Sequence, residues 1–179
     1  MHDWNVVVTV HEAGFSKGYK FLETMGLVAK TDFFNVLVMR VEDIRRALEL
    51  LHGKLAEDPD IANLIARFVP VTHTFNFQSP EMFEVKAREI VSQWVPILAG
   101  KSFHVRMRRR GFKGRLSSME EERFLDEHLL EALEKTGTPG RITFTDPDYV
   151  IAVVTIGTQA GFSLWTREEL RRFALLKPD

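Results

Sequence analysis

The chain has 179 residues, of which 45% are hydrophobic, and this is enough apolar material for one sizeable core or two small ones. It has no cysteine, which excludes disulfides, thiolate zinc sites, iron–sulfur clusters and cysteine nucleophiles, and which fits a cytoplasmic protein. No basic segment followed by an apolar run opens the sequence, and no segment reaches about 18 uninterrupted apolar residues. We therefore expect neither a secretion signal nor a membrane span, and no membrane partner.

Charge is distributed unevenly along the chain. The segment Lys101–Arg115 (KSFHVRMRRRGFKGR), called the basic segment below, contains seven Lys and Arg and no Asp or Glu. Removing these seven from the 24 Lys and Arg leaves 17 cations against 25 anions, a formal charge of −8 for the remainder. A concentrated cationic segment on an acidic protein is typical of selective nucleic-acid binding. The alternative is a solvated surface in which these arginines pair with Glu120, Glu121 and Glu122.

The first part of the chain alternates strand and helix patterns, in an order that suits a ferredoxin-like α/β unit over residues 1–78. Short β-branched runs indicate strands, helical spacing of apolar residues indicates helices, and glycines mark their ends. The predicted elements are a strand at Asn5–Val10, a helix around Tyr19–Met25 ended by Gly26, a strand at Phe33–Arg40, a helix at Ile44–Leu51 ended by Gly53, a short helix at Ile61–Ala66 and an extended segment at Phe68–Phe77.

A second α/β unit is predicted over residues 79–179, packed against the first. Ser79 and Pro80 suit the N-cap and first position of a helix, and Ser118 with Glu121 suits a capping box on a later helix. The predicted elements are a helix from Pro80 to Leu98, the strand of the basic segment, a helix from Ser118 to Lys135, strands at Arg141–Thr145, Tyr149–Ile156 and Gly161–Trp165, and a helix at Arg167–Ala174.

The basic segment combines a strand pattern with a glycine-framed loop. Alternation along the strand predicts that Phe103, Val105 and Met107 enter the core while His104, Arg106 and Arg108 face solvent. In the loop, Gly111 and Gly114 allow a close backbone approach to a ligand, and Phe112 either stacks on an unpaired base or packs inward. The residues predicted to bind RNA are Arg106, Arg108, Arg109, Arg110, Phe112, Lys113 and Arg115.

Motifs for catalysis are missing from the sequence. It contains no GxGxxG, P-loop, HExxH or GxSxG pattern and no recognisable metal-binding spacing of histidines, so we expect no cofactor, no metal and no catalytic residues. His73 and His104 fit structural or surface roles, and Asp146-Pro147-Asp148 is typical of a turn. The alternative is an enzyme acting on RNA or nucleotides, with His104, Asp146 or Asp148 in proton transfer.

The order of elements in the second unit resembles the THUMP domain, an RNA-binding module of tRNA-modifying proteins. The similarity follows a helix after Ser79-Pro80, then FHVRMRRRGFKGR, then SSMEEERF, and it is most characteristic in TDPDYVI and GFSL. Together with the approach Arg67–Val71, the whole chain resembles the stand-alone adaptor family that assists tRNA N4-acetylcytidine formation. Its basic segment is more cationic than that family leads us to expect.

This resemblance implies a non-catalytic protein that binds tRNA and presents it to a separate tRNA-modifying enzyme. The basic strand and loop would contact RNA, while Asp146, Pro147 and Asp148 would maintain the fold. A third class, a protein-interaction module whose arginines meet an acidic partner, also fits the charge pattern. Binding by such a module would survive nuclease treatment.

Overall fold

The computed structural model of the chain describes residues 1–178, and it divides them into two compact units. The first unit contains Met1–Thr72 and Glu168–Lys177, and the second is built from His73–Arg167. Both units combine helices with a β-sheet, which confirms the predicted α/β class. Within the described residues, no helix has the length and apolarity needed to cross a membrane.

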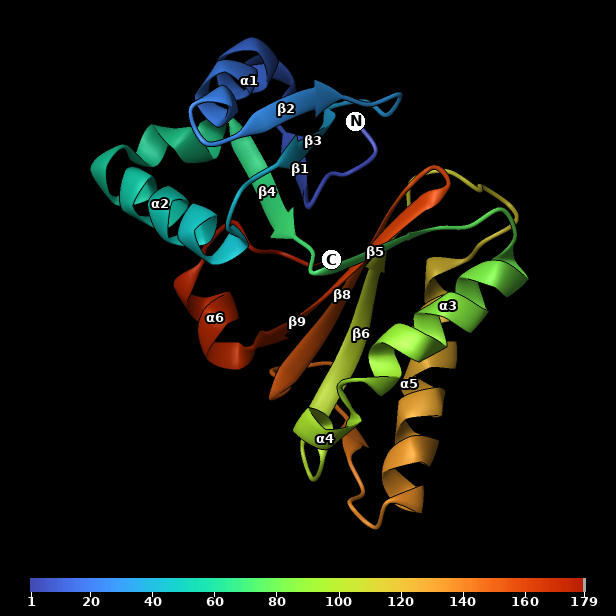
Figure 1. Cartoon of the computed structure of the whole chain (residues 1–179). Helices are drawn as coiled ribbons and strands as arrows, with labels where there is room; N and C mark the ends of the chain where they lie inside the picture. The colour runs from blue at the N-terminus through green and yellow to red at the C-terminus, as the bar shows by residue number, and fades with distance from the viewer. Residues whose placement is uncertain (179) are drawn as a thin grey trace. The chain divides into compact units, whose positions relative to one another are not determined.

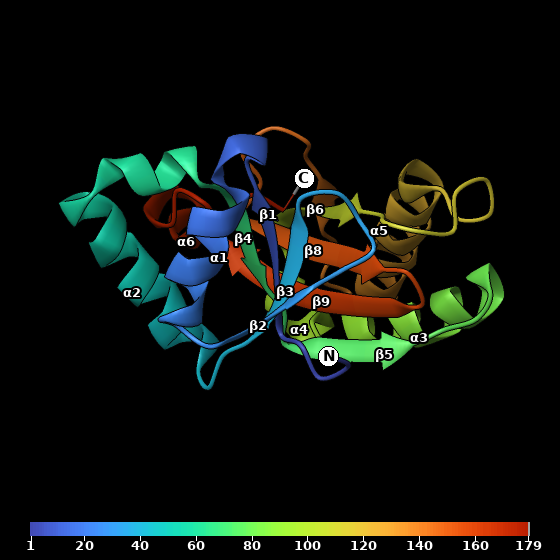
Figure 2. The ribbon, with the colours of Figure 1, turned by 90° about the horizontal axis from the view of Figure 1, so that it is seen from above.

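The first unit is a four-stranded antiparallel sheet with the strand order β2-β3-β1-β4. Figures 1 and 2 show α1 and α2 on one face of this sheet. The β-α-β-β-α-β succession with this strand order is the predicted ferredoxin-like arrangement. Its elements are β1 (Val6–Val10), a 3₁₀ turn (Glu12–Gly14), α1 (Phe15–Glu23), β2 (Leu27–Lys30), β3 (Val36–Arg40), α2 (Ile44–Glu57), a second 3₁₀ turn (Pro59–Asn63) and β4 (Ile65–Pro70).

The end of α2 differs from the prediction. The helix starts where the Asp43 side chain accepts a hydrogen bond from the Arg46 N–H at 3.0 Å, and it continues past Gly53, which we expected to end it. It ends before Asp58 instead, because the residue preceding a proline disfavours the helical region and Pro59 follows. A glycine costs a helix only about 1 kcal/mol, so neighbouring apolar contacts outweigh it.

The structure also differs from the prediction at two strands, β4 and β2. The predicted helix at Ile61–Ala66 is instead a 3₁₀ turn followed by β4, in which Ile65 pairs with Val10 of β1. No strand was predicted at β2, because this edge strand leaves Leu27 67% exposed and so lacks an apolar alternation. Strand pairing, a long-range interaction, decides both segments.

The C-terminal segment returns to the first unit, although the prediction assigned it to the second. Helix α6 is short (Arg167–Arg172), and after it Leu175 accepts a hydrogen bond from the Phe68 N–H of β4 at 2.8 Å. Arg172 pairs with Glu49 of α2 at 2.6 Å, which lowers the pKa of that carboxyl. These contacts join residues that lie far apart in the sequence, so local patterns do not predict them.

The second unit is a five-stranded sheet with the order β5-β9-β8-β6-β7. Strands β6, β7 and β8 run parallel to one another, whereas β9 runs antiparallel to both β8 and β5. Figure 1 shows α3 and α5 side by side along one face of this sheet. The elements are β5 (His73–Asn76), α3 (Pro80–Ser92), α4 (Val95–Leu98), β6 (Ser102–Arg108), α5 (Ser118–Lys135), β7 (Arg141–Ile142), β8 (Tyr149–Ile156) and β9 (Gln159–Thr166).

The start of this unit lies earlier than the predicted boundary at residue 79. β5 pairs with β9 in the register His73 to Phe162, so the strand belongs to the second sheet and the extended segment Phe68–Phe77 is two strands. The predicted helix start is confirmed, because Ser79 Oγ accepts a hydrogen bond from the Met82 N–H at 3.1 Å.

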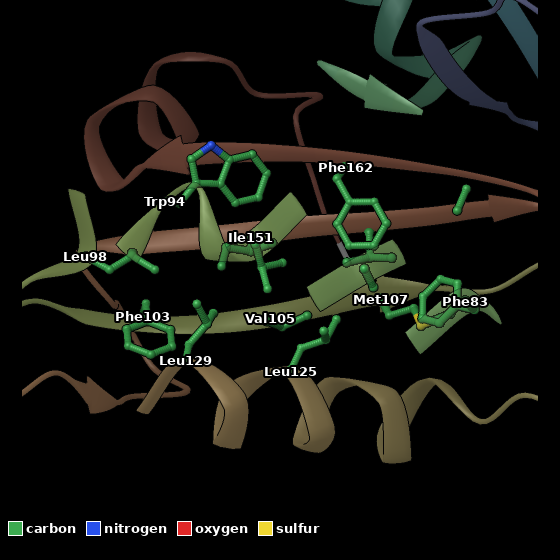
Figure 3. Close-up of a cluster of buried hydrophobic side chains, with 14 of the residues drawn as sticks. Phe83, Trp94, Leu98, Phe103, Val105, Met107, Leu125, Leu129, Ile151 and Phe162 are labelled. Carbon is green, nitrogen blue, oxygen red and sulfur yellow. The ribbon is translucent and has the colours of Figure 1, made fainter. Parts of the chain in front are cut away.

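The core of the second unit lies between its sheet and the helices α3 and α5. Figure 3 shows Leu125 and Leu129 of α5 directed toward the strand that carries Phe103 and Val105. All four side chains are fully buried. This packing fixes β6, and with it the first half of the basic segment, on a rigid support.

Candidate nucleic-acid interface

The β6 strand confirms one face of the predicted alternation and corrects the other. Phe103, Val105 and Met107 are buried in the core, as predicted. Arg106 and Arg108 are half-buried on the alternate positions, but His104 is only 4% exposed. The expectation that His104 faces solvent is therefore wrong. Its Nδ1 lies 2.9 Å from Oδ2 of Asp126 on α5, and this partner supplies the hydrogen bond that a buried imidazole needs.

The edge of β6 is closed by carboxylates where strand pairing ends. β7 pairs only with Ser102 and Phe103, so the later backbone groups on that side have no neighbouring strand. Asp126 Oδ1 accepts the Val105 N–H at 3.0 Å, and Glu122 Oε2 accepts the Met107 N–H at 2.9 Å. The two acids lie one helical turn apart on the same side of α5. Their carboxylates therefore accept the backbone hydrogen bonds that a neighbouring strand would otherwise accept. The carboxylate of Glu122 is thus hydrogen-bonded to the backbone of β6.

Three arginines of the basic segment make hydrogen bonds that hold them close to the sheet. Arg106 Nη2 donates to the Phe144 carbonyl at 3.2 Å, and the Arg109 guanidinium donates to the Gly111 carbonyl. The backbone N–H of Arg110 donates to the Thr155 carbonyl at 3.2 Å, which extends the β6–β8 pairing by further residues. All three side chains are half-buried, so they hold cationic charge at fixed positions beside the sheet.

The loop that follows presents the exposed cations. Gly111, Phe112 and Gly114 have φ angles of 99°, 55° and 79°, so the chain turns sharply through left-handed conformations. Lys113 and Arg115 are exposed on this turn. The predicted loop is confirmed, and these two residues are its most accessible positive charges.

Phe112 packs inward, which decides between the two alternatives left open by the sequence. Its ring centroid lies 5.0 Å from that of the buried Phe77, and the Arg115 guanidinium lies 4.8 Å above the Phe112 ring. One side of the ring thus contacts the core and another side contacts a cation. The interaction positions Arg115 on the loop surface.

The start of α5 also differs from the prediction. Ser117, not Ser118, is the N-cap, and its Oγ accepts a hydrogen bond from the Glu120 N–H at 3.3 Å. Glu121 does not close a capping box, since it is buried and 4% exposed. Burial, followed by the neighbouring carboxyl of Glu84, raises the pKa of Glu121 to about 8. This raised pKa favours the protonated form of Glu121, which faces Glu84 of α3.

The Asp146-Pro147-Asp148 segment is a bend in the chain before β8, where a turn was predicted. Asp148 Oδ2 accepts hydrogen bonds from the Ser102 N–H at 2.9 Å and the Ser102 hydroxyl at 3.0 Å, which lower the pKa of Asp148. Arg167 Nε lies 2.9 Å from Asp146 Oδ1, and Asp146 has a φ of 53°. Both carboxylates thus hold strand ends together.

A pocket of about 430 Å³ lies beside the open edge of β6, and no sequence pattern predicts it. Its residues come from β6, from successive turns of α5, and from β7 and the segment after it, so no single stretch of sequence identifies them. The sequence predicted only a strand at Arg141–Thr145 in this region, and the structure forms its first two residues as β7. The lining residues are His104, Arg106, Met119, Glu122, Arg123, Asp126, Glu127, Leu130, Ile142 and Phe144.

The remaining histidine prediction concerns His73, whose ring lies edge-on to Trp94 with centroids 5.6 Å apart. This contact fits the structural role expected for it. Across residues 1–178, no three His, Cys, Asp or Glu side chains gather in a way that would hold a metal ion.

Comparison with known proteins relates the chain to others by structure alone. No protein-family model matches, and neither does any curated protein sequence. PH1313 from Pyrococcus horikoshii Ot3 has 14% identity and a TM-score of 0.58, over 90% of this chain and 54% of its own. TrmN from Thermus thermophilus has 18% identity and a TM-score of 0.55, over 89% and 44%.

A third solved structure, a complex of a 4-thiouridine synthetase with RNA and bound ATP, has 16% identity and a TM-score of 0.50. The match covers 92% of this chain and 42% of the synthetase. The chain thus spans about half, or less, of the length of these three proteins. At such identities the likeness establishes a shared α/β fold that extends over both units.

Proposed function

We propose that this chain is an RNA-binding protein of the THUMP type whose preferred ligand is tRNA. The observation that carries the proposal is the basic segment, in which seven cations occur without an acid and Lys113 and Arg115 stand exposed on a loop. A fold shared with a synthetase solved in complex with RNA supports it, as does the THUMP-like order of elements.

Binding is led by phosphate contacts and by RNA shape. Cations on a short strand and loop neutralise phosphates, but too few groups are present to distinguish a long base sequence. The half-buried Arg106, Arg108, Arg109 and Arg110 hold their charge close to the sheet, and Lys113 and Arg115 reach further into solvent. We assign Phe112 the role of supporting Arg115, and not that of a stacking platform for a base.

The protein acts without catalysis and presents its tRNA to a separate modifying enzyme. The missing nucleotide and metal motifs support this part of the proposal, together with the resemblance to the stand-alone adaptor family. Asp146 and Asp148, considered as acid–base groups, are engaged with Arg167 and Ser102. Nucleoside analysis of tRNA incubated with the purified protein and candidate donors tests it, and a new modified nucleoside would overturn it.

The RNA-binding test compares two variants of equal charge change. Lys113→Ala with Arg115→Ala removes the exposed loop cations, whereas Lys54→Ala with Lys135→Ala removes exposed cations from the last turns of α2 and α5. We expect only the first pair to weaken tRNA binding in a gel-shift or anisotropy titration. Equal affinities would place the site elsewhere, and a partner that stays bound after nuclease treatment would favour a protein-interaction module.

A second candidate function rests on the His104–Asp126 pair. A buried carboxylate that orients an imidazole beside a pocket is an arrangement used in proton transfer. Under this alternative the protein is an enzyme acting on RNA or nucleotides, with His104 as the group that moves the proton. Turnover by the purified protein that is lost in His104→Gln, while the variant still folds and binds RNA, would support it.

A further inference from the structure

The pocket beside β6 has the composition of a ligand site. Ligand pockets typically enclose roughly 300–1,000 Å³, combining apolar walls with a few placed polar groups, and this one measures about 430 Å³. Ile142 and Leu130 contribute apolar wall, and Met119 and Phe144, 72% and 65% exposed, stand at its rim. All of these residues belong to the second unit.

The polar group in the pocket is held in one orientation. Nδ1 of His104 is hydrogen-bonded to Oδ2 of Asp126 at 2.9 Å. The other ring nitrogen, Nε2, is therefore directed away from that carboxylate. The Phe144 ring lies nearly perpendicular to the imidazole, at 79° and a centroid distance of 4.5 Å. The segment that carries Phe144 is tied to β6 by the hydrogen bond from Arg106 to its carbonyl. The aromatic platform and the imidazole are thus prearranged.

The charged side chains around the pocket favour the base and the phosphate of a nucleotide at different places. Glu122, Asp126 and Glu127 line it, and such acids disfavour a phosphate inside. Arg106 and Arg123 also line it, and either suits a phosphate that stays outside the acidic wall. A neutral, flat, polar-edged group fits the interior better than an anion does.

We propose that this pocket holds one unpaired nucleobase of a bound RNA, stacked on Phe144 with its polar edge toward His104 and its phosphate toward Arg106 or Arg123. The inference rests on the proposed RNA binding and deepens it, since the cations of the loop hold phosphates of any RNA whereas this pocket requires a base that is not paired. Aromatic stacking accepts all four bases, so the pocket selects single-stranded character.

The experiment uses the full chain and two RNAs of matched length. One is a blunt, fully paired duplex, and the other is a duplex with a short unpaired extension that contains 2-aminopurine. We expect Phe144→Ala to weaken binding of the extended RNA by about 5- to 100-fold, the effect of removing one stacked base, and to leave the blunt duplex unchanged. The 2-aminopurine fluorescence should be quenched by the wild-type protein and not by this variant.

Three further variants control the result. Phe144→Trp keeps a stacking surface and should retain both the affinity and the quenching. Phe34→Ala removes a 77% exposed phenylalanine of the first unit and should change neither. Lys113→Ala with Arg115→Ala should weaken both RNAs alike, because it removes phosphate contacts.

The outcomes distinguish the inference from the proposed function. If the wild-type protein binds neither RNA, the RNA-binding proposal fails and the base pocket fails with it. If it binds both and Phe144→Ala, still folded by its thermal melt, binds the extended RNA as tightly as wild type, only the base pocket is overturned. Preferential weakening of the extended RNA, reversed by Phe144→Trp, supports it.

Discussion

Asp126 on α5 holds His104 on β6 through its Oδ2, 2.9 Å from Nδ1, while its Oδ1 accepts the Val105 N–H at 3.0 Å. One carboxylate thus satisfies both a buried imidazole and an unpaired strand edge. The hydrogen bond joins residues 22 positions apart and fixes α5 against the basic strand.

We expect Asp126→Ala to lower the free energy of unfolding by about 2–4 kcal/mol, because it leaves two buried donors without an acceptor. Asp126→Asn should cost less, since its amide oxygen still accepts the Val105 N–H. Urea denaturation measures both. Glu127→Ala, an exposed neighbour, is the control and should fall within about 0.5 kcal/mol of wild type. An equally small effect in Asp126→Ala would contradict the role assigned to this carboxylate.

Glu121 makes stability depend on pH. Its folded pKa is raised to about 8, so the folded state keeps a proton that the unfolded state releases above its ordinary value of 4.5. The unfolded state then binds fewer protons, and the free energy of unfolding falls as pH rises from about 4.5 to about 8. We expect Glu121→Gln to reduce this fall, as measured by denaturation at a series of pH values. Parallel curves for the two proteins would show that Glu121 is not protonated in the folded state.

Phe112 contributes to stability through its packing against Phe77. We expect Phe112→Ala to lower the free energy of unfolding by about 1–3 kcal/mol, less than the same change at a fully buried phenylalanine, because the ring is half-buried. Phe112→Leu should retain part of that packing. A thermal or urea melt measures the effect, and an unchanged melt combined with weaker RNA binding would indicate that the ring contacts RNA instead.

Salt should weaken RNA binding strongly. If four to seven phosphates are neutralised, the logarithm of the binding constant falls with the logarithm of salt concentration at a slope of roughly −3 to −6. Lys113→Ala with Arg115→Ala should make that slope shallower by about 2, one for each phosphate that is no longer neutralised. Titrations at several salt concentrations measure it, and a flat dependence in the wild type would exclude the electrostatic mechanism.

Local sequence patterns predicted the parts of the fold that near neighbours decide. The alternation in β6 placed Phe103 and Val105 in the core, and Ser79 with Pro80 marked the start of α3. The strand Tyr149–Ile156 was predicted with its observed bounds. In each case the signal is a period or a cap, and both depend on residues only a few positions apart.

The sequence by itself therefore determined the α/β class, the ferredoxin-like order and the concentration of cations at Lys101–Arg115. Only the tertiary structure decided that His104 is buried and that Phe112 packs inward, because their partners Asp126 and Phe77 come from distant elements. It also decided the pocket, whose walls meet through the pairing of β6 with β7 and the packing of α5. The contacts that a side chain makes across a sheet edge produce no periodic pattern in the sequence, so these features follow from packing alone.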